Sequence, residues 1–297
     1  MCMRDKIKLA YVGADVPQRF DELKVDGRVC GIAQLDDEIF ITTSSSPSIS
    51  VFCFRGRQNF DKREDVSIHD SVEALKDITA SAEFQHLFVA DSGNRCVWQL
   101  EKSSWGQGWT AKDRAVSKVD PVSLSVNARR LLVVERRRLT VVVVGEKKLK
   151  PTALPGNLEA EHALETSHGT FVVCGRVAEK PGVVEVNIRG ALQRVCDSQS
   201  LGFPGYLSTF GTDEKEETFL VADFGTSRVV LLNSELQVVR VLLDEVNDHV
   251  RQPCRVLASG RLLVGYAERS DDYDNSRGTV GLYYPHKSKL QSLSDAQ

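Results

Sequence analysis

The feature that most constrains this chain is an internal repeat. Residues 87–97 and 219–229 share one pattern: an apolar strand, Ala-Asp, a turn containing glycine, an arginine and a second apolar strand. The aspartate can accept turn N–H groups, and the glycine supplies a positive φ. We predict that Asp91 pairs with Arg95, and Asp223 with Arg228, inside these turns. The motif therefore builds a β-hairpin and does not imply catalysis.

The hairpin recurs along the whole chain. Each copy adds a short first strand before the hairpin and a weaker fourth strand after it. The first strands begin near Cys30, Ala74, Pro121, Glu161, Pro204 and Pro253. A period of about 45 residues with four strands is typical of propeller blades. The sequence predicts an all-β, six-bladed β-propeller of four-stranded antiparallel blades, near 29–70, 71–117, 118–154, 155–197, 198–244 and 245–285.

The ring needs one more strand to close. The sixth copy has no clear fourth strand, whereas the N-terminal residues 7–13 form a spare apolar segment. We expect 7–13 to pair beside 279–284, which makes residues 1–285 one closed domain and 286–297 a tail. Residues 157–164 have helical propensity, but their place in the repeat favours a loop and an inner strand.

Composition narrows the class of protein. The 297 residues carry a formal net charge of −3, which disfavours a uniformly basic nucleic-acid binder. No apolar run reaches the ~18 residues that span a bilayer, and the N-terminus lacks a signal-peptide core. The cysteine count is odd, seven, without a C-x-x-C pair, which favours free thiols. We expect a cytoplasmic monomer with no membrane association.

The motif residues carry a family resemblance. Cys-Gly-Ile-Ala at 30–33 and Ala-Asp-Ser-Gly-Asn at 90–94 resemble the NHL repeat. In the third, fourth and sixth copies Glu135, Cys174 and Ala267 replace the aspartate, so these copies match only in strand order. The resemblance implies a propeller similar to the C-terminal domain of tripartite-motif proteins, with a protein or an RNA as its partner.

One face of the ring is the predicted binding surface. Loops on a rigid scaffold commonly carry function, and the turns between second and third strands share one end of the ring. The predicted binding residues are Asn94, Arg136, Arg137, Arg176, Phe224, Arg269, Tyr273 and Arg277. The basic cluster around 129–150 is expected to divide, with Arg129 and Arg130 at the opposite end. That division favours solubilising charge over nucleic-acid contact.

The alternative is an enzyme at the central channel. His69, His162 and His249 fall in or just before the first strands of alternate copies, where they could form a tri-imidazole metal site. A lyase or lactonase of this kind is the alternative function, with Glu161 and Asp77 as the acidic candidates of a lactonase. No G-x-S-x-G, P-loop or H-E-x-x-H motif is present. The sequence favours a non-enzymatic binding scaffold without catalytic residues or cofactors.

Overall fold

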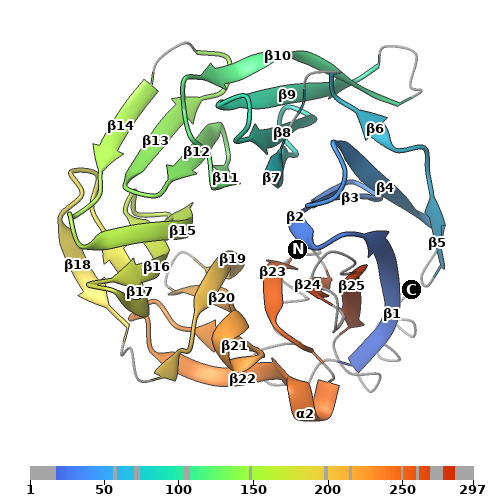
Figure 1. The fold of residues 1–297 in the computed structure, drawn as a ribbon. Coiled ribbons are helices and arrows are strands. Elements are labelled where there is room, and N and C mark those ends of the chain that lie inside the picture. Colours follow the sequence, from blue (N-terminus) through green and yellow to red (C-terminus); the bar gives the residue numbers. More distant parts are fainter. Residues whose placement is uncertain are drawn as a thin grey trace.

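Six antiparallel sheets surround a central axis (Figure 1). The computed structural model describes residues 18–55, 59–69, 72, 74–103, 108–146, 149–196, 200–213, 216–248, 250–258, 261–267 and 277–284. The predicted all-β, six-bladed propeller is confirmed. Among the described residues, the short helical segments Phe224–Thr226 (η2) and Glu245–Asp248 (α2) interrupt the strands in or after blade 5. No helix in the described ranges is long and apolar enough to cross a bilayer.

In blades 1 to 5 the strands run outward from the axis in chain order, and in blade 6 the N-terminal strand is outermost. Blade 1 contains Val29–Leu35 (β2), Glu38–Thr43 (β3), Ser48–Arg55 (β4) and Asn59–Lys62 (β5), with Val66–Ser67 (β6) against β4. Blade 2 contains Leu75–Ser81 (β7), His86–Asp91 (β8), Cys96–Lys102 (β9) and Trp109–Ser117 (β10). Blade 3 contains Ser123–Asn127 (β11), Arg130–Glu135 (β12), Arg138–Val143 (β13) and Leu149–Ala153 (β14).

The second half of the ring repeats this order. Blade 4 contains Leu158–Glu165 (β15), Phe171–Val177 (β16), Lys180–Val186 (β17) and Leu192–Val195 (β18). Blade 5 contains Pro204–Asp213 (β19), Glu216–Asp223 (β20), Arg228–Leu232 (β21) and Val238–Asp244 (β22). Blade 6 contains Pro253–Ala258 (β23), Leu262–Ala267 (β24), Arg277–Tyr284 (β25) and Gln18–Asp26 (β1). The segment with helical propensity is thus a strand, β15, as its place in the repeat predicts.

The N-terminal strand β1 completes blade 6. It runs antiparallel to β25, from Gln18 opposite Tyr284 to Asp26 opposite Arg277. The prediction that residues 7–13 take this place is wrong, and those residues lie outside the described part. The strand alternates instead of being continuously apolar: Leu23 and Val25 are buried in the seam with blade 1, with a charged residue between them.

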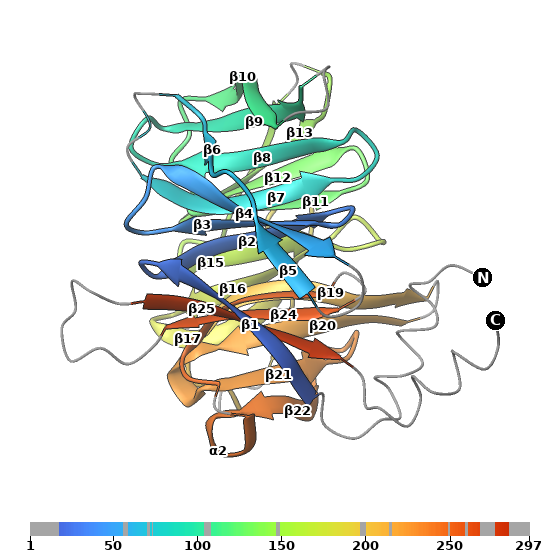
Figure 2. The ribbon, with the colours of Figure 1, turned by 90° about the vertical axis from the view of Figure 1, so that its right-hand side faces the viewer.

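Apolar packing is distributed around the whole ring. Each of the six seams between neighbouring blades contains its own cluster of buried apolar side chains. Seen from the side (Figure 2), the strands cross the thickness of the ring, so successive turns lie alternately on its two faces. We call the face with the turns between second and third strands the turn face. The six packed seams support this face and make it rigid.

Candidate functional site

A buried aspartate organises the turn of blade 5. The Asp223 carboxylate is fully buried and accepts hydrogen bonds from the backbone N–H groups of Gly202, at 3.0 Å, and Phe203, at 2.7 Å. It also accepts the Thr226 hydroxyl, and Arg228 Nη2 lies 3.3 Å away. The structure therefore contains the predicted Asp223–Arg228 pair. The aspartate fixes the entry into the blade as well as the turn.

The equivalent turn of blade 2 is built differently. Asp91 accepts hydrogen bonds from Asn94 Nδ2, at 2.8 Å, and Trp98 Nε1, at 3.1 Å. Arg95 is exposed and left-handed, with φ 52°, and no Arg95–Asp91 ion pair occurs among the described residues. Asn94 and Trp98 thus take the place of the predicted Arg95. The reason is that Cys96 lies opposite Asp91 in the ladder, whereas Arg228 lies opposite Asp223.

Arg95 acts instead on the neighbouring blade. Partial burial alone would raise the pKa of Glu135, but hydrogen bonds from Arg138 and from the Asp120 backbone N–H oppose this effect. The charges of Arg138 and Arg95 act in the same direction, and the pKa of Glu135 is lowered as a result. Glu135 therefore stays ionised beside the turn of blade 3.

Three predicted arginines gather on the turn face across blades 3 and 4. Arg136 and Arg137 form the turn between β12 and β13, and Arg176 lies near the end of β16. Arg137 Nη2 donates to Glu159 Oε1 at 3.0 Å. This hydrogen bond, with the charges of Arg137, Arg136 and Arg176, lowers the pKa of Glu159. Arg137 thus contacts this surface carboxylate, and Arg136 and Arg176 act on it through their charges.

Aromatic rings continue this surface onto blade 5. The Arg176 guanidinium lies over the Phe203 ring, 5.6 Å from its centroid, and Phe203 meets Phe224 edge-on at 6.4 Å. Phe203 is not among the predicted residues, because it precedes a first strand and belongs to no repeated motif. We call Arg136, Arg137, Arg176, Phe203 and Phe224 the arginine–aromatic surface. It can bind acidic groups and flat apolar groups side by side.

Two arginines of the basic cluster lie at the opposite end of blade 3. Arg129 and Arg130 are at the turn between β11 and β12, whereas Arg136 and Arg137 are at the other end of β12. Arg129 pairs with Glu83 at 3.7 Å, and Arg130 pairs with Glu165 at 2.9 Å. The charge is divided between two faces, as the strand order predicts.

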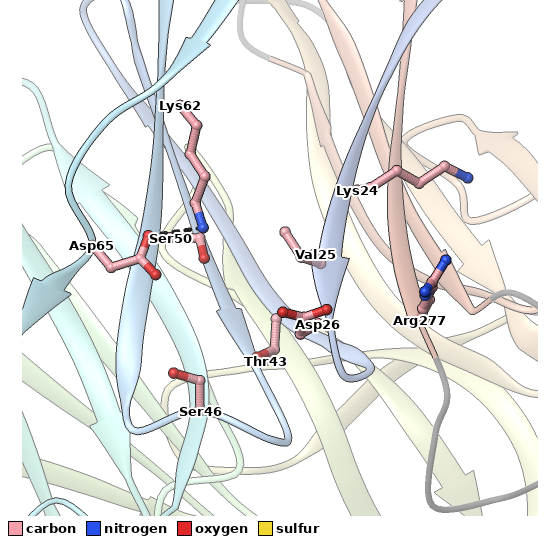
Figure 3. Close-up of a pocket in the computed structure, with 9 residues that line it drawn as sticks. All are labelled: Lys24, Val25, Asp26, Thr43, Ser46, Ser50, Lys62, Asp65 and Arg277. Atoms are coloured by element: carbon pink, nitrogen blue, oxygen red, sulfur yellow. Dashed lines mark ion pairs between the residues drawn. The ribbon is translucent and has the colours of Figure 1, made fainter.

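Arg277 lines a pocket where blades 6 and 1 meet on the turn face. The pocket has a volume of about 480 Å³ and is lined by Lys24, Val25, Asp26, Thr43, Ser46, Ser50, Lys62, Asp65 and Arg277 (Figure 3). Lys62 pairs with Asp65 at 3.5 Å, and Lys24 pairs with Glu22 at 3.1 Å. The lining mixes both signs of charge. The predicted residues Arg269 and Tyr273 lie outside the described residues.

The axis carries a layer of six residues, one from each blade. Each pairs with the same level of the second strand in its blade, and all but Ser123 follow a β-bulge in the first strand. The members of this axial layer are Gly31, Asp77, Ser123, His162, Tyr206 and Arg255. The sequence singles out Asp77 and His162 as site candidates and Gly31 as a motif residue, but not the layer as a whole, because bulges break the simple alternation of a strand.

Asp77 joins several blades through the axial layer. It is fully buried and accepts hydrogen bonds from the backbone N–H groups of Ile78 and Leu124, both at 2.9 Å. The Tyr206 hydroxyl donates to it from 3.4 Å, and Arg255 Nε lies 3.8 Å away. Burial raises the pKa of Asp77 to about 6, against the opposing charge of Arg255. The interactions connect blades 2, 3, 5 and 6 at the axis.

The remaining members fit around this carboxylate. Gly31 leaves room for it, since a Cβ there would lie 2.7 Å from Asp77 Oδ1. The His162 ring packs on Tyr206, with centroids 3.7 Å apart, and its Nε2 lies 3.3 Å from the Leu124 carbonyl oxygen. Burial, aided by the charge of Arg255, lowers the pKa of His162 to about 3. This imidazole is neutral at ordinary pH.

The predicted metal candidates lie in different surroundings. His69 is exposed and stacks on Trp98 at 5.8 Å, whereas His162 is buried at the axis. His249 lies outside the described residues. Within the described ranges, no group of three or more His, Cys, Asp or Glu residues is arranged to hold a metal ion. The cation at the axis is Arg255, which opposes binding of a metal ion beside it.

Comparison with known proteins supports the fold of this chain but does not identify its function. No family model and no curated protein matches this chain. Selenomethionine-substituted virginiamycin B lyase from Staphylococcus aureus is similar at TM-score 0.56 and 9% identity, over 89% of this chain and 99% of the lyase chain. The WD40 β-propeller domain of Doa1 gives TM-score 0.58 and 11% identity, over 92% and 98%. Hydrazine synthase from Kuenenia stuttgartiensis gives 0.57 and 14%, over 85% and 74%. At these identities the likeness establishes the β-propeller fold alone.

Proposed function

We propose that this chain is a non-enzymatic, NHL-like propeller that binds an acidic segment of a partner protein. The observation that carries the proposal is the gathering of Arg136, Arg137 and Arg176 around Glu159, with Arg176 placed over Phe203. Arginine and aromatic side chains dominate the energetics of many protein interfaces. A partner carboxylate would compete with Glu159 for Arg137, and an apolar partner residue would cover Phe203 and Phe224.

An RNA would use the same surface in another way, with phosphates on the arginines and bases on the rings. The protein partner is favoured because Arg176 already lies over the Phe203 ring and Phe203 meets Phe224 edge-on, an arrangement that offers no pair of parallel rings for successive bases. We propose a cytoplasmic monomer as the acting form, to be checked by sedimentation and by localisation of the tagged chain.

The test compares two labelled probes on the same protein. One is a short peptide of alternating glutamate and tyrosine, and the other is a single-stranded RNA of similar length. We expect the peptide to bind, and Arg136→Glu with Arg137→Glu to weaken it by about tenfold or more, about 1.4 kcal/mol. Fluorescence anisotropy at two salt concentrations measures both probes.

Arg129→Glu with Arg189→Glu is the matched control for this experiment. It reverses two exposed arginines at the opposite face, so it changes the net charge by the same amount without touching the arginine–aromatic surface. Equal losses from this control and from the turn-face variant would mean that only net charge matters. Tight RNA binding with no peptide binding would replace the protein partner by an RNA.

The alternative is a metal-dependent lyase or lactonase with its site at the central channel. Its support is the similarity to virginiamycin B lyase, at 9% identity, and the polar axial layer. Elemental analysis of the purified protein tests it directly. Stoichiometric zinc or calcium that is lost in His162→Ala with His249→Ala would favour the enzyme over the binding scaffold.

A further inference from the structure

Exposed apolar side chains are confined to one sector of the outer rim. Among the described residues, large apolar side chains with high exposure lie only in blades 3 to 5 and directly after them. The rim patch consists of Leu149, Ile188, Leu192, Val195, Val239 and Val241. Val239 is 56% exposed and Ile188 63%, so these side chains contribute nothing to the seams. Clustered apolar exposure of this kind marks interaction surfaces.

Polar contacts join the neighbouring blades that carry the rim patch. The Thr152 hydroxyl of β14 donates to the Ile188 carbonyl oxygen at 3.0 Å, which joins blade 3 to blade 4. Arg194 of β18 donates to the Ser234 carbonyl oxygen at 2.8 Å and pairs with Glu235, which joins blade 4 to blade 5. The outer strands β14, β18 and β22 therefore follow one another along the edge of the ring (Figure 1).

The outer edge of β22 is the longest in this sector. β22 has seven residues, whereas β14 has five and β18 four. It is the last strand of its sheet, so its outward N–H and C=O groups face no further strand among the described residues. Arg240 lies between the exposed Val239 and Val241. β22 is bulged against β21 on both sides of the Arg240–Val241 pair, so an added strand would meet Val239, Arg240 and Val241 without a strict alternation of faces.

We propose that β22 accepts an extended acidic segment of another protein as a fifth strand of blade 5. Backbone hydrogen bonds to the edge would supply affinity, and alternate side chains would supply specificity. Glutamate or aspartate matches Arg240, and valine or isoleucine matches the two exposed valines. The exposed residues Lys150 and Arg189 add positive charge along the rim patch. A second copy of this chain is disfavoured, because self-pairing of β22 would bring two arginines together.

The probe is an acetylated peptide of alternating valine and glutamate, added to the full chain. We expect slower amide hydrogen exchange in residues 238–244, the signature of a new strand partner. Val239→Ser with Val241→Ser removes both apolar contacts without adding charge and should weaken binding by about tenfold or more. Val246→Ser is the control, since it removes an 84% exposed valine just beyond β22 and should leave binding unaltered.

Further peptides distinguish strand addition from other modes of binding. A peptide with proline at its centre should fail to bind, because proline removes a ladder donor. A valine–lysine peptide should bind more weakly than the valine–glutamate peptide. Equal binding of both peptides, unchanged exchange in β22, or concentration-dependent dimers would each overturn the proposal. Arg136→Glu with Arg137→Glu should leave this protection intact, so the test is independent of the turn-face proposal.

Discussion

Replacing Arg255 with methionine tests whether the axial layer depends on a buried charge pair. The substitution keeps an unbranched stem next to the Tyr206 ring but removes the cation 3.8 Å from Asp77. Burial has already raised the pKa of Asp77 to about 6, and Arg255 is the first of the effects that oppose this rise. In Arg255→Met the pKa of Asp77 therefore moves above 6.

The magnitude follows from linkage between protonation and folding. A carboxyl whose pKa is higher in the folded state loses stability as pH rises, until the pH passes the folded pKa. In the natural chain this loss ends near pH 6, the folded pKa of Asp77, whereas in the variant it continues to higher pH. Each further pKa unit corresponds to about 1.4 kcal/mol. Breaking a buried pair costs about 3–5 kcal/mol in total, so most of this cost should emerge above that pH.

Urea unfolding followed by tryptophan fluorescence measures the effect at several pH values. We expect Arg255→Met to be only slightly less stable than the natural chain at about pH 5, and less stable by about 3 kcal/mol or more at about pH 8. His162 adds to this difference between acid and alkaline pH. The charge of Arg255 helps lower the pKa of His162, so removing Arg255 makes protonation of the imidazole easier and stabilises the variant in acid.

The control is Asp77→Asn combined with Arg255→Met. This double variant has neither charge, so its free energy of unfolding should regain part of the loss and should no longer fall between about pH 6 and about pH 8. A loss in Arg255→Met that is the same at every pH would refute the reasoning. It would mean that Arg255 stabilises the axis by packing on Tyr206 and not by its charge.

Three further predictions concern single positions. Asp223→Ala should lower the free energy of unfolding by about 3 kcal/mol, because it leaves buried N–H groups and Arg228 without their acceptor; thermal melts measure it, and Asp223→Asn should cost less because its amide keeps one acceptor oxygen. Gly175→Ala should cost about 2 kcal/mol or more by urea unfolding, because φ is +153° and a Cβ would lie 2.1 Å from the Glu159 carbonyl oxygen; the same change at Gly156, which faces open space, is the control. His162→Phe should reduce the loss of stability as pH falls below 6.5, because the folded-state pKa of His162, about 3, lies below its unfolded value; an unaltered acid profile would contradict the burial of this imidazole.

The blades could be predicted from the sequence because their signal is repeated. Apolar strands, Ala-Asp turns and a constant period all indicate the same sheet order. The closing strand could not be placed correctly, because residues 7–13 are more apolar than β1. β1 is a half-buried outer strand in which Leu23 and Val25 alternate with Glu22 and Lys24, and such strands give a weaker signal.

The site residues differ in the same way: contacts within one turn could be predicted from the sequence, and contacts between blades could not. The Asp223–Arg228 pair lies within one turn and could be predicted. The contact of Arg176 with Phe203 and that of Asp77 with Arg255 join different blades, so no local pattern indicates them. The bulges that place Asp77 and Arg255 in one layer also hide that layer from a search for period-two alternation.

The pairing of β1 with β25 has a mechanical consequence. Gln18 lies opposite Tyr284, so the two ends of the described chain leave blade 6 side by side. A force that pulls these ends apart would act across the ladder and break its hydrogen bonds one after another from this end. The ring should therefore open at blade 6 under a small load, although the same strand pair closes it against thermal unfolding.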